Sequence, residues 1–207
     1  MAKMKPRWLA TVAVCVLALV IVTTLLVREH DRSNQYERHL STKLRNDQSA
    51  LIAAIYALRD DVGTLLGSET PDADIKARLT DNIYAVVRIA QDMDGMAVDF
   101  DLVSRDRLAN STSSAAARAA VTLDRIDAEA IQARERDKLR VIKDMLTEWT
   151  GVIERVYPGY APGDPERMAK ALHDRIGDPA YFIRDEAWQE LILGLEQASK
   201  AYHTRLP

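Results

Sequence analysis

The chain has 207 residues, a formal net charge of −3 and one cysteine. A single cysteine excludes a fold held together by internal disulfides, so side-chain packing must stabilise it. Because 31 Asp and Glu exceed 28 Lys and Arg, the chain is a poor match for the phosphates of nucleic acid, and we expect no nucleic-acid partner.

The first predicted element is a transmembrane helix. Residues 8–27 form an uncharged apolar run that includes Trp8, Leu17 and Leu26. Twenty helical residues rise about 30 Å, which matches the hydrocarbon core of a bilayer. The run exceeds the ~7–15 apolar residues of a signal peptide and ends without the small residues of a cleavage site, so we predict a retained signal anchor.

The charges around this span predict its orientation. Three basic residues lie within 1–7, and basic residues mark the cytoplasmic side of a single span. We therefore predict a cytoplasmic tail over 1–7, a juxtamembrane segment over 28–38 and a domain over 39–207 on the other side. The excess of Arg over Lys is typical of a GC-rich bacterial source, so the predicted location is the inner membrane, with the domain in the periplasm.

The domain begins with a predicted helix over 39–66. Apolar residues recur at spacings of three and four from Leu44 to Leu65, and Gln48 is the one polar residue in that row. This period places the row on one face of a helix, which must pack against other elements.

A second helix is predicted over 71–108. It follows Thr-Pro-Asp at 70–72, a sequence that starts helices, and its apolar row runs from Leu79 to Phe100. Two helices joined by a short turn pack antiparallel, so we expect a hairpin.

Three further helices are predicted, over 113–157, 165–176 and 179–204. The Ser-rich stretch at 110–114 separates the first of them from the preceding helix, and the Pro- and Gly-rich stretch 158–163 ends it. Since no segment shows the two-residue alternation of a half-buried strand, the predicted fold is all-α. It is an antiparallel four-helix bundle whose fourth member is broken at Gly177.

One acidic stretch partly matches a calcium-binding loop. Asp92, Asp94, Gly95, Asp99 and Asp101 resemble an EF-hand sequence, but aligning the glycine leaves the first ligand position to alanine and shortens the last ligand. The surrounding helical row also continues through it. We therefore interpret these residues as a solvated acidic helix face and predict no metal site.

The remaining chemistry-bearing residues form no catalytic pattern. The four histidines are dispersed, and no phosphate-binding loop, serine elbow or cysteine nucleophile is present in the sequence. We expect no enzymatic activity and no cofactor.

The Pro- and Gly-rich loop over 158–163 is the predicted partner-binding site. Tyr157 and Tyr160 lie in or beside it, with Arg155 and Arg167 nearby, and aromatic residues with arginine are enriched at interfaces. The alternative is that these aromatic residues belong to the core, which is the commoner role of aromatics at helical spacing.

The function is therefore predicted from architecture alone. We expect a protein-binding or structural subunit of an envelope assembly, whose partner is another protein or a second copy of the chain, while residues 8–27 contact membrane lipid. One alternative is a sensor that binds a small molecule and signals through a membrane partner, a layout similar to chemoreceptor input domains. The other is a membrane-spacing rod, similar in layout to the inner-membrane spanins of phage lysis.

Overall fold

A computed structural model describes residues 6–68, 72–126, 131–175, 178–202 and 204–206. All regular structure in these ranges is helical, which confirms the predicted all-α class.

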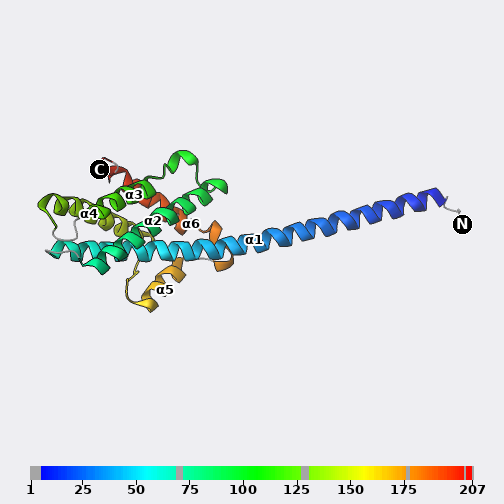
Figure 1. Ribbon diagram of the computed structural model, residues 1–207. Coiled ribbons are helices and arrows are strands. Elements are labelled where there is room, and N and C mark those ends of the chain that lie inside the picture. Colours follow the sequence, from blue (N-terminus) through cyan, green and yellow to red (C-terminus); the bar gives the residue numbers. More distant parts are fainter. Residues whose placement is uncertain (1–5, 69–71, 127–130, 176–177, 203, 207) are drawn as a thin grey trace.

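Helix α1 (Pro6–Gly67) is one uninterrupted helix of 62 residues. It joins the predicted span, the juxtamembrane segment and the first bundle helix, because no proline or glycine interrupts the chain between Arg7 and Val62. Figure 1 shows that its N-terminal part projects far beyond the other helices. We call residues 6–33 the arm, and the end of the bundle from which the arm leaves the root. Residues 15–33 are all exposed, whereas one face of α1 is buried from Ser41 onward.

Within the described residues, none of the helices combines the length and the apolar character needed to cross a bilayer.

Helix α2 (Ala73–Asp99) returns antiparallel to α1, as predicted. The ion pair between Lys43 Nζ and Asp92 Oδ2 at 3.5 Å lies near the root, and the pair between Arg78 and Asp61 at 2.7 Å lies near the other end. Asp72 caps the helix by accepting a hydrogen bond from the Asp74 N–H at 2.9 Å. The residues 70 and 71 of the predicted start signal lie outside the described ranges.

Helix α2 ends nine residues before the predicted boundary at 108. Asp101 has a left-handed φ of 54°, and the N–H groups of Asp101 and Leu102 donate to the carbonyls of Val98 and Ala97. This pattern is a Schellman motif, which closes a helix and usually has glycine at the left-handed position. The motif was missed in the sequence because an aspartate occupies that position. A 3₁₀ turn, η1 (Arg105–Arg107), follows.

The predicted helix over 113–157 is two helices, α3 (Ser111–Asp124) and α4 (Ala133–Val156). The start of α3 confirms the predicted break at the Ser-rich stretch. Helix α4 begins with a capping box, in which Gln132 and Glu135 bond each other's backbone N–H groups. This start signal lies in the interior of the predicted helix over 113–157. Residues 127–130 lie outside the described ranges.

Helix α5 (Pro165–Arg175) agrees with the prediction, but the last predicted helix, over 179–204, is interrupted. It consists of a 3₁₀ segment η2 (Pro179–Arg184), helix α6 (Glu186–Ser199) and a 3₁₀ turn η3 (Lys200–Tyr202). Asp185 caps α6 through a hydrogen bond from the Ala187 N–H at 2.8 Å, so the chain turns there. The predicted break at Gly177 lies outside the described ranges.

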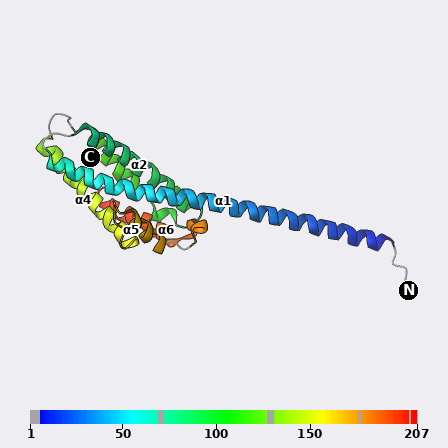
Figure 2. The same cartoon turned by 90° about the horizontal axis from the view of Figure 1, so that it is seen from below.

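The described helices form a ring of five around one core, not the predicted four. Helix α1 packs on α2 and α4, α2 on α3, α3 on α6, and α6 on α4 (Figures 1 and 2). The fifth member arises because α3 and α4 are separate. Trp149 and Trp188 are the largest side chains buried in this core, and α5 lies outside the ring.

Candidate functional site

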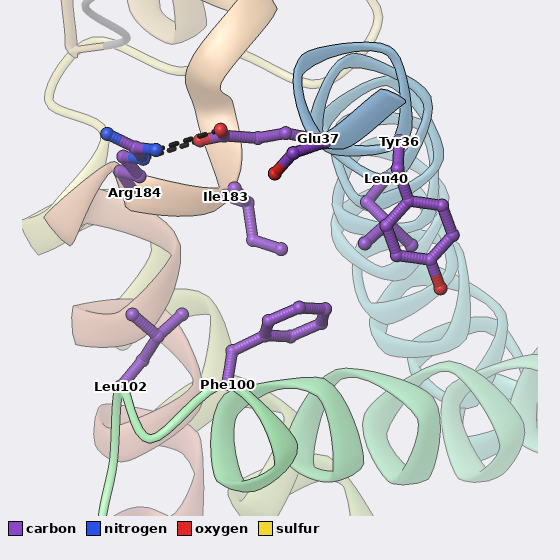
Figure 3. Close-up of a pocket in the computed structure, with 8 residues that line it drawn as sticks. Tyr36, Glu37, Leu40, Phe100, Leu102, Ile183 and Arg184 are labelled. Atoms are coloured by element: carbon purple, nitrogen blue, oxygen red, sulfur yellow. Dashed lines mark hydrogen bonds and ion pairs between the residues drawn. The ribbon is translucent and has the colours of Figure 1, made fainter. Parts of the chain in front are cut away.

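A hollow with a largely apolar lining lies at the root of the bundle. We call it the root groove; its volume is about 290 Å³ and it opens to solvent. Three separate segments line it: α1, the chain after α2, and η2. The lining residues are Ser33, Tyr36, Glu37, Leu40, Phe100, Leu102, Ile183 and Arg184 (Figure 3).

Helix α1 supplies one wall of the root groove. Its lining residues recur every three or four positions, so they share one face of the helix. Leu40 is half-buried, but Tyr36 is 61% exposed. In Figure 3 the ring of Tyr36 stands beside Leu40, at the edge of the groove.

The end of α2 supplies the opposite wall. The Schellman motif turns the chain away after Asp99. In Figure 3 the ring of Phe100 projects into the groove, and Leu102 lies on the side of η2, where it also packs against the core. We had placed Phe100 in the buried row of α2, but it is 42% exposed. The early helix end explains the difference, because the helical period no longer applies at position 100.

The η2 segment closes the third side. Arg184 pairs with Glu37 through both Nε and Nη2, and the Nη2–Oε2 distance is 2.8 Å. The Ile183 N–H donates to Ser41 Oγ at 3.1 Å, which holds η2 on α1. The Arg184 guanidinium also lies 5.7 Å from the centre of the Tyr181 ring.

This arrangement favours binding of an apolar side chain over chemistry on a substrate. The lining is mostly apolar, and its one cation, Arg184, is already neutralised by Glu37. In the part of the chain that the structure describes, no three metal-binding side chains lie close enough together to hold an ion.

The predicted partner-binding residues lie elsewhere, and two of them are buried. Tyr157 is fully buried, and Tyr160 stacks on Tyr56 with ring centres 5.5 Å apart. Burial raises the pKa of both predicted tyrosines. Arg155 and Arg167 are exposed. Since Tyr56 is twenty residues along α1 from Tyr36, this cluster lies about 30 Å from the root groove.

Most of the acidic stretch is solvated as expected, since Asp92, Asp99 and Asp101 are exposed, but Asp94 is not. Asp92 is exposed and pairs with Lys43, but Asp94 is only 5% exposed and its Oδ2 has no hydrogen-bond partner. Burial, reinforced by the charge of Glu196, raises the pKa of Asp94 to about 7. The structure therefore removes Asp94 alone from the exposed acidic set.

Glu196 organises the start of α3. It is buried and accepts hydrogen bonds from the Ala109 N–H at 3.0 Å, the Ser111 N–H at 2.7 Å and the Ser111 hydroxyl at 2.6 Å. A carboxylate that satisfies several donors stabilises the turn they belong to. This role was not predicted, because nothing in the sequence distinguishes Glu196 from solvent-exposed glutamates of α6.

The predicted membrane residues all lie in the arm. Leu17 and Leu26 are exposed, and the side chain of Trp8 lies outside the described part of the structure. Large apolar side chains are exposed along the described part of the predicted span. Their exposed fractions lie between 51% and 71%, and the residues are Val16, Leu17, Leu19, Val20, Ile21, Val22, Leu25, Leu26 and Val27.

Comparison of the chain with models of known families, with curated proteins and with solved structures finds no match.

Proposed function

We propose that the chain is a membrane-anchored interaction module, whose arm inserts in the bacterial inner membrane and whose bundle binds protein in the periplasm through the root groove. On this proposal it has no catalytic role. The exposed apolar arm carries the proposal, because a continuous apolar surface of this size requires lipid or protein to cover it.

The length of the uncharged run supports lipid, as opposed to protein, as the partner that covers the apolar arm. The predicted span, residues 8–27, is uncharged throughout, and charged residues of α1 flank it directly, Arg7 before it and Arg28 after it. A helix of this composition is stable in a bilayer, where its backbone groups are bonded internally.

The position of the groove favours protein over lipid as its occupant. Tyr36 lies nine residues beyond Val27, or about 14 Å along the helix. The headgroup layer adds only about 5–8 Å to each side of the hydrocarbon core. The root groove therefore lies just beyond the headgroups, at the height where membrane-proximal segments of proteins run.

A photo-crosslinking amino acid at Phe100, in living cells, tests the protein-binding part of the proposal. We expect Phe100 to form an adduct with a protein. The control position is Tyr84, which is 50% exposed and lies on the same helix, about 24 Å farther from the root. No protein adduct at Phe100, or equal adducts at both positions, would contradict a docking role for the groove.

Small-molecule sensing is the second candidate, since the root groove is hollow and includes a cation, Arg184. Its volume lies at the lower limit of ligand pockets, which are usually ~300–1,000 Å³. A compound that binds the folded chain at a concentration of 100 times its Kd stabilises it by about 2.7 kcal/mol. Thermal melting of the full chain against a panel of small molecules would reveal this, and an unchanged midpoint throughout would favour the interaction module. The rod-like alternative has less support, because residues beyond the arm pack into a bundle.

A further inference from the structure

Tyr36 is the one apolar residue of α1 between Val27 and Leu40. All its neighbours in this stretch are charged or polar. Tyr36 is 61% exposed and lies at the edge of the root groove (Figure 3). Exposed aromatic rings are enriched where proteins contact one another.

We propose that the root groove binds Tyr36 of a second copy of this chain, so that two copies associate side by side as a parallel dimer. The proposal deepens the proposed function and rests on its membrane anchor. Two anchors in one membrane must point the same way, and confinement to the membrane raises the effective concentration of each copy for the other.

The geometry of the groove satisfies the symmetry of such a dimer. In a two-fold dimer, if Tyr36 of one copy enters the groove of its partner, the reverse contact must form too. Parallel copies place equal residue numbers at equal heights, so the ring and the groove that receives it must lie at the same height. They do, because Tyr36 itself lines the groove together with Leu40 and Phe100.

The surface continues from the groove into the arm. A row with spacings of three and four residues runs along α1 and consists of Leu19, Val22, Leu26, Glu29, Ser33, Tyr36 and Leu40. This is the 3.5-residue period of a two-stranded parallel coiled coil. Glu29 is the one charged member, and it lies two residues outside the predicted span, where the carboxylate remains hydrated.

The charges beside this row are complementary between parallel copies. In a parallel coiled coil, a flanking residue of one helix faces the residue five positions later on the flank of the other. Arg32 of one copy would thus face Glu37 of its partner. Arg32 is exposed, and Glu37 forms an ion pair with Arg184 of its own chain, so the contact would extend that pair into a network.

The natural cysteine makes this dimer testable in membranes. Cys15 lies 21 residues, or six helical turns at the 3.5-residue period, before Tyr36 and is on the same face. Oxidation of membranes that contain the full chain should therefore link two copies through Cys15. Tyr36→Arg should lower the linked fraction at least fivefold, whereas Tyr84→Arg should leave it unchanged.

A control on the opposite face completes the experiment. In the double variant Cys15→Ser and Leu17→Cys, the cysteine points away from the proposed contact, and linkage should fall at least fivefold.

Absence of linkage through Cys15, equal linkage through position 17, or no effect of Tyr36→Arg would overturn the dimer. Retention of the chain in alkaline-washed membranes, measured on the same samples, distinguishes this failure from failure of the anchor. A Phe100 photo-adduct with a different protein would uphold the proposed function and contradict the second copy.

Discussion

Asp94 shows how far the environment of a residue can differ from its sequence context. It lies among acidic residues that are typical of a solvated helix face, but it points into the bundle near Glu196. Burial favours its neutral form, since an ionised carboxylate without partners loses its hydration.

We expect this carboxyl to make the stability of the bundle depend on pH. The pKa of Asp94 is raised from 3.8 to about 7, so folding favours the protonated form. Its contribution is complete below about pH 4 and is lost as the pH rises through 7. The whole shift of about three pH units corresponds to roughly 4 kcal/mol, and about two of these units, or roughly 3 kcal/mol, lie between pH 5 and pH 8. Denaturant unfolding of the full chain in detergent at these two pH values would measure the change.

Asp94→Asn removes the titrating group and keeps the size of the side chain. We expect the variant to be more stable than the natural chain at pH 8 and to lose this advantage at lower pH. A matched change, Asp92→Asn, removes an exposed carboxylate two residues away and should leave the pH dependence in place. The same pH dependence in the Asp94→Asn variant would show that another group is responsible.

The role of Asp101 follows from the geometry of its backbone. Its φ of 54° is costly for a residue with a Cβ and free for glycine. We expect Asp101→Gly to raise the free energy of unfolding by about 0.5–1 kcal/mol, measured by thermal melting. Destabilisation by this change would contradict the Schellman motif.

At the scale of the elements, α4 and α6 approach closely at Gly194. A Cβ at this position would lie 2.6 Å from Val152 Cγ1, and valine in a helix has little freedom to move aside. Gly151, on the facing helix α4, has open space around it.

Alanine at these two glycines should therefore have opposite effects. We expect Gly194→Ala to lower the free energy of unfolding by about 1–2 kcal/mol through overpacking. Gly151→Ala should raise it by about 0.5–1 kcal/mol, because alanine is the better helix former. Denaturant unfolding measures both, and equal signs for the two variants would show that the helices are spaced differently.

The sequence predicted helix faces better than helix ends. The row from Leu44 to Leu65 is buried as expected, and the Ser-rich break before α3 is confirmed. The end of α2 and the start of α4 were missed because Asp101 and Gln132 perform roles more often filled by glycine and serine. A start signal at Asp185 was overlooked within an apparently continuous helix.

The root groove could not be predicted from the sequence, because it depends on contacts between distant segments. Its walls come from segments nearly 150 positions apart, and the contact between Ile183 and Ser41 depends on where η2 lies. One signal was present: Tyr36 is an isolated aromatic residue in a charged stretch. The predicted site at Tyr157 and Tyr160 shows the converse, because loop aromatics that suggested a binding spot are packed inside.

At the scale of the whole molecule, one continuous helix, α1, forms both the exposed arm and part of the bundle. No break in the helix separates the apolar arm from the root groove. This continuity gives the proposed anchor and the proposed docking site a fixed relation.

Alkaline extraction of membranes, followed by intact-mass analysis of the chain, is the most direct test of the proposed membrane anchor. We predict that the full 23.2 kDa chain, with residues 8–27 still attached, remains in the washed membrane pellet. Recovery of the chain in the soluble fraction, or of a mature form that begins after Val27, would contradict the anchor and with it the position of the groove beside a membrane.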